Sequence, residues 1–338
     1  AWVDDGGMLY VGPQTAGAVP GPSCYGQGGD KPTVTDASLV LGYLDPEFFL
    51  GGSMALDLDG ARGAIERDVA GPMGIGLEDA AAAIISIATE NMVQAIVDIT
   101  VNQGIDPRDA ILIGGGGAAG LNSTAIGRRL GSERVVIPEV GAALSAAGAM
   151  MSDLHSQYTR TFFATSENFD AAGVNQILDG LEARCNAFID GPGKGSISQT
   201  IEFFAEARYP DQVWEIEVPL AARRFESDAD VEALIEEFHK VHEDLFAIND
   251  PGSGIEVVGW TASVKCQLKE SESGSLAPAE EDTSIDGTRK VYFAETGYVD
   301  ATVRRFEAMK TGETLPGPAI IESPFTTVVV NPGATAER

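Results

Sequence analysis

The sequence predicts an α/β chain built from two consecutive domains, residues 1–155 and 156–338. A chain of 338 residues is long for one domain. Between residues 110 and 138, a strand, a glycine loop, a helix and a second strand follow one another, which is typical of a βαβ unit. Beyond residue 156 the pattern changes to strands interrupted by one helix, which is typical of an α+β domain.

Composition narrows the range of possible partners. Hydrophobic residues make up 44% of the chain against 22% charged residues, which indicates a folded protein. The 51 acidic residues outnumber the 22 basic ones and give a net charge of -29, so nucleic acid is not expected as a partner. A saline habitat or simple solubility would also explain this acidity. An anionic ligand would depend on backbone N–H groups, a helix N-terminus and a metal ion.

Three widely spaced cysteines and the hydropathy pattern favour a cytoplasmic location. Cys24, Cys185 and Cys266 show no CxxC spacing, so neither a disulfide framework nor a structural zinc site is indicated. No uninterrupted apolar run approaches the roughly 18 residues of a membrane helix, and the N-terminus carries no signal-peptide pattern. We therefore expect no membrane association. We also expect the chain to begin within a fold, because it starts with a strand pair and lacks an initiator Met.

The first domain is predicted to combine a long loop with helices. Residues 12–29 are rich in glycine and proline, which forbids a helix and implies an ordered loop. Either Thr35 or Asp36 is expected to cap a short helix that follows this loop. Apolar residues at helical spacing predict a long helix over residues 77–104.

The second domain is predicted to contain one clear helix, over about residues 228–245. Residues 270–286 are polar and predict a loop. Runs rich in β-branched and aromatic residues predict strands at residues 200–206, 213–218, 255–268, 290–293 and 319–322.

The glycine run from Gly114 to Gly117 is the sharpest local signal. It follows a predicted strand and precedes a helix, so its backbone can approach a nucleotide while the helix N-terminus faces anionic groups. Gly115, Gly117 and Gly120 formally satisfy G-x-G-x-x-G, but they lie far into the chain, which disfavours a dinucleotide-binding fold. No Lys-Ser or Lys-Thr follows it, which excludes a Walker A loop. Close packing of helix on strand would explain such glycines without a ligand.

Other candidate residues are less specific. Asp36 stands out among many acidic residues because it lies near a helix N-terminus after the glycine-rich loop. His239 and His242 lie three residues apart on one helix face, which is compatible with metal binding, although a structural role is the simpler interpretation. Cys24 has no histidine close to it in sequence, so a packed thiol is a simpler interpretation than a nucleophile.

Several of these segments together resemble the large subunits of the hydantoinase A / 5-oxoprolinase / acetone carboxylase family. The resemblance covers nearly the whole chain, and the co-occurrence of its segments makes it specific. The segments are residues 11–13, 16–29, 32–37, 39–42 and 49–52 with Met54 and Asp57, the stretch from Asp106 into the glycine loop, residues 144–148, Arg208-Tyr209 with Gln212, His242-Glu243, and residues 317–322.

This resemblance implies an actin-like lobe for residues 1–155, of the acetate kinase, sugar kinase, Hsp70 and actin type, followed by an α+β C-terminal domain. It implies ATP and Mg²⁺ as cofactors, with Asp36 as the residue we expect to be catalytic. The loop expected to lie against the adenosine consists of Gly114, Gly115, Gly116 and Gly117. Where family members often have Gly-Gly-Ala-Gly-Pro, this chain has Gly115-Gly116-Gly117-Ala118-Ala119.

The family's N-terminal lobe, with its Asp-Gly-Gly-Thr phosphate loops, is absent from the sequence. We therefore expect the chain to require that lobe and a hydantoinase B-type subunit as partners. The expected function is that of a subunit or fragment of an ATP-dependent cyclic-amide hydrolase, of hydantoinase, oxoprolinase or lactamase type, which phosphorylates the carbonyl oxygen of its substrate. Two alternatives stay open: a subunit of an ATP-dependent ketone carboxylase of the acetone or acetophenone carboxylase type, and a non-catalytic assembly scaffold.

Overall fold

The computed structural model describes residues 1–101, 104–270 and 287–338, which form two compact units. Unit 1 contains Ala1–Gly148 and the described part of Gly274–Arg338, and unit 2 contains the described part of Ala149–Ser273. The first boundary lies near the expected one at residue 155. The C-terminal segment differs from the expectation, because it packs with unit 1 and does not continue the second domain. The polar loop predicted from residue 270 lies, beyond its first residue, outside the described residues.

The first part of unit 1 consists of short strands and helices. Its elements are β1 (Trp2–Val3), β2 (Leu9–Tyr10), η1 (Ser23–Tyr25), α1 (Val34–Val40), η2 (Phe49–Gly52), α2 (Leu58–Ile65), η3 (Glu66–Ala70), α3 (Gly71–Met73), α4 (Leu77–Val101), η4 (Pro107–Asp109), β3 (Leu112–Ile113), α5 (Ala119–Leu130), β4 (Val135–Val136), η5 (Gly141–Ala143) and α6 (Leu144–Met151). The predicted long helix is α4. The predicted βαβ unit is β3, α5 and β4, and its two strands are parallel, as expected.

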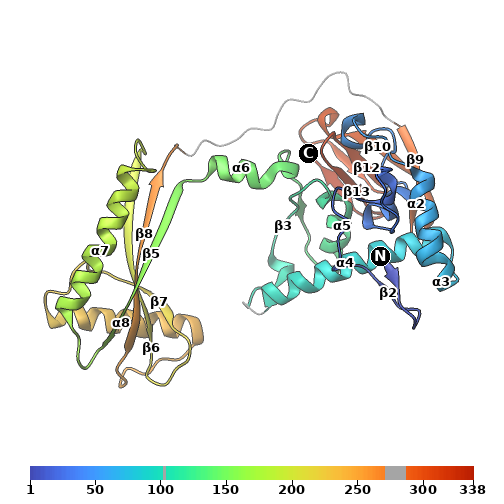
Figure 1. The fold of residues 1–338 in the computed structure, drawn as a ribbon. Helices are drawn as coiled ribbons and strands as arrows, with labels where there is room; N and C mark the ends of the chain where they lie inside the picture. Colours follow the sequence, from blue (N-terminus) through green and yellow to red (C-terminus); the bar gives the residue numbers. More distant parts are fainter. Residues whose placement is uncertain (102–103, 271–286) are drawn as a thin grey trace. The chain divides into compact units, whose positions relative to one another are not determined.

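The C-terminal strands complete the core of unit 1, where Figure 1 shows them in orange and red beside the blue N-terminal helices. These elements are β9 (Gly287–Phe293), β10 (Gly297–Arg305), η6 (Phe306–Ala308), β11 (Thr314–Pro316), β12 (Ala319–Glu322), β13 (Thr327–Val330) and β14 (Thr335–Glu337). One sheet has the order β13-β12-β10-β9, and β11 pairs with β14. Phe293 and Ile320 of this sheet share a hydrophobic core with α1, α2 and α4. That shared burial explains why the C-terminal segment belongs to unit 1.

By length and composition, α4 is apolar enough to cross a membrane, contrary to the expectation that no segment would be. The expectation considered uninterrupted apolar runs, whereas the mean hydropathy of α4 stays high across its scattered polar residues. A single helix of this kind is weak grounds for a membrane span. Ile84 and Val93 of α4 are buried against other elements of unit 1, which is typical of a core helix.

Unit 2 combines an antiparallel sheet with two helices. Its elements are β5 (Leu154–Thr165), α7 (Ala171–Asp190), β6 (Ser198–Arg208), β7 (Ile216–Pro219), α8 (Asp228–Phe246) and β8 (Glu256–Gln267). The strand order is β5-β8-β6-β7. Trp260 of β8, Leu178 of α7 and Phe238 of α8 belong to one buried core, so both helices pack on the sheet. The helix predicted at residues 228–245 is α8.

α7 is a second helix in unit 2, so the prediction of one helix there is wrong. Its N-cap residue Asp170 accepts a hydrogen bond from the Gly173 amide at 2.9 Å. Its buried side chains recur at helical spacing and are Val174, Leu178, Leu181 and Cys185.

Candidate functional site

A pocket of about 260 Å³ in unit 1 brings the predicted glycine loop together with two segments that are distant in sequence. Its walls come from residues 44–50 around η2, from the start of α5, and from residues 322–327 between β12 and β13. A larger pocket of about 760 Å³ lies along the rest of α5 and the β11–β14 pair, and the four predicted glycines are not among its lining residues. We therefore take the smaller pocket, named the η2–α5 pocket below, as the candidate site.

Two of the predicted glycines shape the loop. The Gly114 amide donates a hydrogen bond to the Val136 carbonyl at 2.9 Å, and the Gly116 amide donates to the Gly141 carbonyl at 2.7 Å. Gly116 has a φ of +114°, a conformation that side chains rarely allow. Gly114 and Gly116 therefore hold the loop in place, and their N–H groups are already used.

Of the four predicted glycines, Gly117 lines the η2–α5 pocket, and Gly114, Gly115 and Gly116 are not among its lining residues. The N–H groups of Gly115, Gly117 and Ala118 find no acceptor within the described part of the chain. Gly117 and Ala118 line the η2–α5 pocket at the N-terminus of α5, where no side chain caps the helix and its first turn carries no acidic residue. Free N–H groups and the helix dipole favour an anionic or oxygen-rich ligand at this position.

The turn between β12 and β13 is tied to the glycine loop. The Thr326 hydroxyl donates to the Gly117 carbonyl at 3.0 Å. The Ser323 hydroxyl oxygen accepts from the amides of Phe325 and Thr326 at 3.2 and 3.1 Å, which fixes the turn. Phe325 lines the pocket, yet its side chain is 71% exposed. An exposed aromatic ring on a fixed turn is a ready surface for a planar ligand.

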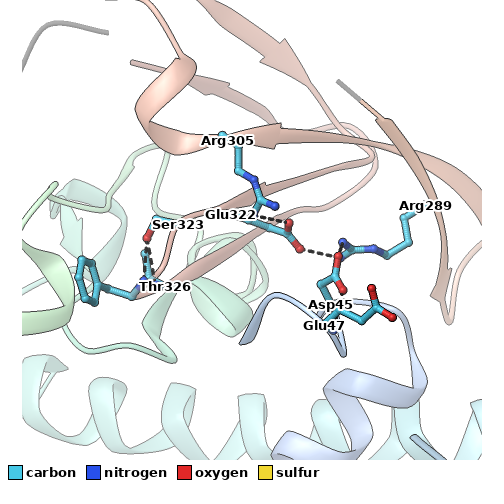
Figure 2. A network of polar contacts seen from close by, with 8 residues as sticks. Asp45, Glu47, Arg289, Arg305, Glu322, Ser323 and Thr326 are labelled. Carbon is cyan, nitrogen blue, oxygen red and sulfur yellow. Dashed lines mark hydrogen bonds and ion pairs between the residues drawn. The ribbon is translucent and has the colours of Figure 1, made fainter. Parts of the chain in front are cut away.

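A buried ionic network supports the same pocket (Figure 2). Glu322 is 2% exposed and accepts from Arg289 at 2.7 Å and from Arg305 at 3.1 Å. Arg289 also donates to Asp45 at 2.8 Å, so the network links β9, β10 and β12 to the segment before η2. The Arg305 guanidinium lies 3.2 Å from the centre of the Phe48 ring. Each arginine is held by two partners, Arg289 by Glu322 and Asp45 and Arg305 by Glu322 and the Phe48 ring, so both stiffen the wall of the pocket.

Leu50 adds a strained residue to the pocket wall. Its φ is +52°, in the left-handed region that disfavours a branched side chain. Such strain persists only where the surroundings impose it, and it is concentrated at functional sites. Asp45 and Phe325 were not predicted from the sequence, and Leu50 and Glu322 appeared there only within segments that resemble the family. These four residues lie in two segments far apart in the chain, residues 44–50 and 322–327. Glu322 could have been predicted as a buried, paired carboxylate, because it is the one charged residue at the end of the apolar strand Ala319–Glu322.

Asp36 does not line this pocket, although its neighbour Thr35 does, and its carboxylate is buried in the protein. The side chain is fully buried, and the N-cap of α1 is Thr33, whereas Thr35 or Asp36 was expected. The Asp36 carboxylate accepts from the Cys24 amide at 2.7 Å, the Ser23 amide at 3.3 Å, and the Thr33 amide and hydroxyl at 2.8 and 2.7 Å. Asp36 thereby fastens the loop at η1 to the start of α1. Its expected role in catalysis remains a prediction.

The remaining candidates are buried. The Cys24 thiol is fully buried, and this burial, with the nearby Asp36 carboxylate, raises the pKa of the thiol well above its usual range. A neutral thiol in that position is a packing group and a poor nucleophile.

His239 and His242 belong to a hydrogen-bonded network in unit 2. The Tyr209 hydroxyl donates to His239 Nδ1 at 2.7 Å and accepts from the Asp250 amide at 2.7 Å. Gln212 donates to His242 Nε2 at 3.2 Å, and His242 Nδ1 donates to the Ile248 carbonyl at 2.7 Å. The two rings therefore have separate partners and do not converge on a common point. This arrangement fits the structural role that was the simpler interpretation.

Two family models and several curated proteins match nearly the whole chain. The Hydantoinase/oxoprolinase family model matches residues 1–158, and the Hydantoinase/oxoprolinase C-terminal domain model matches residues 166–337. Caprolactamase subunit alpha of Pseudomonas jessenii is 38% identical over 339 residues, which cover 98% of this chain and 49% of that relative. Acetophenone carboxylase gamma subunit of Aromatoleum aromaticum is 32% identical, covering 97% of this chain and 46% of that relative.

The fold is shared with a solved structure. The crystal structure of the ATP-dependent caprolactamase from Pseudomonas jessenii superposes with a TM-score of 0.79 at 36% identity, covering 99% of this chain and 49% of that chain. The chain spans about half the length of the curated relatives it matches. Both domain models match in the expected order and together account for nearly all of its residues. The chain belongs to the hydantoinase/oxoprolinase family.

Proposed function

We propose that this chain is part of an ATP-dependent cyclic-amide hydrolase and that the η2–α5 pocket binds the nucleoside end of ATP. The observation that carries the proposal is the pair of free N–H groups of Gly117 and Ala118, which line the pocket at the uncapped start of α5. The similar caprolactamase of Pseudomonas jessenii is ATP-dependent by its description. On this proposal, unit 1 is one lobe of an actin-like fold.

The residues of the pocket suit a nucleoside better than a triphosphate. A volume of about 260 Å³ lies just below the usual range of ligand pockets, about 300–1,000 Å³, so it suits a base and sugar alone. The Phe325 ring offers a stacking surface, and the free amides offer donors to sugar or phosphate oxygens. Arg289 and Arg305 are engaged by Glu322 and Asp45, so they do not supply charge for the outer phosphates.

The outer phosphates and Mg²⁺ require groups from elsewhere. Among the described residues, no three His, Cys, Asp or Glu side chains come together in a group that could hold a metal ion. We therefore propose that Mg²⁺ is held by the phosphates and by an N-terminal lobe that this chain does not contain. A hydantoinase B-type subunit would complete the enzyme. We place the assembly in the cytoplasm, where the free, buried cysteines Cys24, Cys185 and Cys266 would stay reduced.

The chemistry follows from ATP as phosphoryl donor. The amide carbonyl oxygen of the substrate attacks the γ-phosphorus, the bond to the β-phosphate oxygen breaks, ADP leaves, and water later opens the activated ring with release of phosphate. This chain would contribute positioning of the nucleotide and a fixed set of N–H dipoles.

Nucleotide titration of the purified assembly, with and without Mg²⁺, tests the proposal. Phe325→Ala should weaken ATP binding about 10-fold, because one stacking face is lost. Phe163→Ala is the matched control, since Phe163 is also an exposed aromatic residue, at 56%, but lies on β5 in unit 2. Equal affinities for the two variants would contradict the placement of the nucleotide. An assembly that binds no ATP would favour the scaffold alternative.

A ketone carboxylase is the second candidate function, because the similar acetophenone carboxylase gamma subunit is described as part of such an enzyme. Both functions begin with phosphorylation of a carbonyl oxygen. Product formation that requires bicarbonate would identify the carboxylase, and product formation from a lactam or hydantoin without bicarbonate would identify the hydrolase.

We propose that Asp36 acts as a positioning residue for this site, because its carboxylate accepts hydrogen bonds from the backbone of the loop at η1 and from the N-cap Thr33 of α1. Asp36→Asn places an NH₂ group against those donors and should cost about 1–3 kcal/mol of stability. Turnover should fall together with the melting temperature. A variant of wild-type stability and wild-type ATP affinity that has lost turnover would instead make Asp36 a catalytic residue.

A further inference from the structure

The parallel strand pair β3–β4 has one covered face and one open face. Leu112 of β3 is partly buried and packs against Val93 of α4 and Ile126 of α5. The alternate residues Ile111 and Ile113 point to the opposite face and are 59% and 60% exposed. Val136, the partner of Ile113 in the pairing, is 44% exposed. Three β-branched side chains thus lie side by side without a cover within the described residues.

The outer edge of β3 is open as well. The Leu112 and Gly114 amides donate to β4-side carbonyls, those of Arg134 at 3.2 Å and Val136 at 2.9 Å. The amides of Ile111 and Ile113 point the other way and find no acceptor in the described part of the chain. The strand therefore offers a set of unpaired backbone groups beside an apolar face.

Such an arrangement is unusual for a finished sheet. Parallel sheets occur almost only with both faces covered and with more than two strands, because a pair alone buries too little apolar surface. The last turns of α4, the helix that precedes β3, are also exposed: Ile99 and Val101 are 64% and 56% exposed, and 33% of the apolar window of α4 is buried. Surfaces of this kind mark a protein interface.

We infer that β3 and its open face are the docking surface for a strand-forming, apolar segment from the half of the enzyme that this chain does not include. The length of the relatives supports this occupant, since the chain covers 49% of caprolactamase subunit alpha. The added segment would pair with the free edge of β3 and cover Ile111, Ile113 and Val136. This inference does not depend on nucleotide binding.

Hydrogen exchange of single amides tests the inference on the assembly purified from its natural source and on the 338-residue chain alone. The Ile111 and Ile113 amides should exchange at least about 100-fold more slowly in the assembly than in the chain alone, because they gain acceptors. The Leu112 and Gly114 amides are internal controls, since they are bonded in the chain itself. Rapid exchange of Ile113 in the assembly, or a source that yields only this chain, would overturn the inference.

Two variants separate docking from folding. Ile113→Asp places a charge on the open face and should reduce recovery of the assembly about 10-fold, while the melting curve of the chain alone stays as in the wild type, because this side chain is exposed. Met8→Asp is the control at a similarly exposed apolar position, 62%, just before β2. Recovery of the Ile113→Asp assembly at the wild-type level would contradict the proposal that the open face of β3 is a docking surface. A dimer of this chain that protects the Ile113 amide would refute the occupant.

Discussion

The η2–α5 pocket in unit 1 and the Tyr209 network in unit 2, which consists of Tyr209, Gln212, His239 and His242, are built from similar residues but differ in what they leave free to bind. Each combines buried polar side chains with non-glycine residues in the left-handed region: Leu50 in the first, Asp211 and Ala247 in the second. In unit 1 the ionic network stands behind a pocket of about 260 Å³. In unit 2 the ring of Tyr209 packs directly on those of His239 and His242, with ring centres 5.6 and 4.8 Å apart.

The difference indicates how each region contributes to function. Around the pocket, the side chains bond to one another and leave backbone N–H groups of the glycine loop free, so a ligand finds donors. In the Tyr209 network the side chains bond to the backbone of the turn after α8, at Ile248 and Asp250. That network rigidifies a turn, whereas the first arrangement rigidifies a binding surface.

Removal of the Glu322 carboxylate should have the largest effect of the variants considered. Glu322→Ala leaves Arg289 and Arg305 partly buried without their shared partner and should cost about 3–5 kcal/mol of stability in unit 1. Urea unfolding followed by circular dichroism measures this loss. The exposed Glu232→Ala is the control and should stay within about 0.5 kcal/mol of wild type. A small loss for Glu322→Ala would mean that the network does not support the pocket.

Removal of one hydroxyl in unit 2 should have an intermediate effect. Tyr209→Phe deprives His239 Nδ1 of its donor and the Asp250 amide of its acceptor, at a cost of about 1–3 kcal/mol. ATP affinity of the assembly should not change, because Tyr209 lies in unit 2. Tyr298→Phe is the control, since its hydroxyl bonds Glu78 on the surface of unit 1. A weaker ATP affinity for Tyr209→Phe would contradict the assignment of a purely structural role to the Tyr209 network.

Local patterns in the sequence were sufficient to predict much of the fold. Apolar spacing predicted α4 and α8, and the glycine run between two β-branched segments predicted the parallel β3–α5–β4 unit. The same spacing was present in α7 but was missed among the surrounding strand-like segments. Capping was misassigned by two or three residues, since the choice between Thr33, Thr35 and Asp36 depends on which hydroxyl reaches the N3 amide.

Long-range features could not be predicted in the same way. The strands from β9 through β13 belong to unit 1 because Phe293 and Ile320 are buried against helices more than two hundred residues earlier in the chain. No local sequence pattern predicts a contact over such a separation. The glycine loop was predicted as a candidate, but the ring of Phe325 and the carboxylate of Glu322 reach the same pocket only because these strands belong to unit 1. Half of the candidate site therefore depends on tertiary contacts.

A lower pH should destabilise unit 2 through His239, and this is the smallest of the predicted effects. Burial, together with the neighbouring His242, lowers the pKa of His239, while the Asp250 carboxylate opposes this shift. In the folded chain the neutral ring accepts the Tyr209 proton at Nδ1, and a second proton there would break that bond. The unfolded chain takes up this proton below its ordinary pKa of about 6.5. Because the unfolded state then binds more protons than the folded state, stability of unit 2 should fall as the pH drops from about 7 to about 5.

The His239→Gln variant should flatten that pH dependence, because it removes the group that titrates only after unfolding. Urea midpoints of the wild type, His239→Gln and the control His155→Gln, measured across this pH range, make the comparison. His155 is exposed on the edge strand β5, so His155→Gln controls for the loss of an imidazole outside the Tyr209 network. Equal slopes for all three proteins would show that the Tyr209 network tolerates a charged His239, and that unit 2 is less tightly packed around its histidines than their burial indicates.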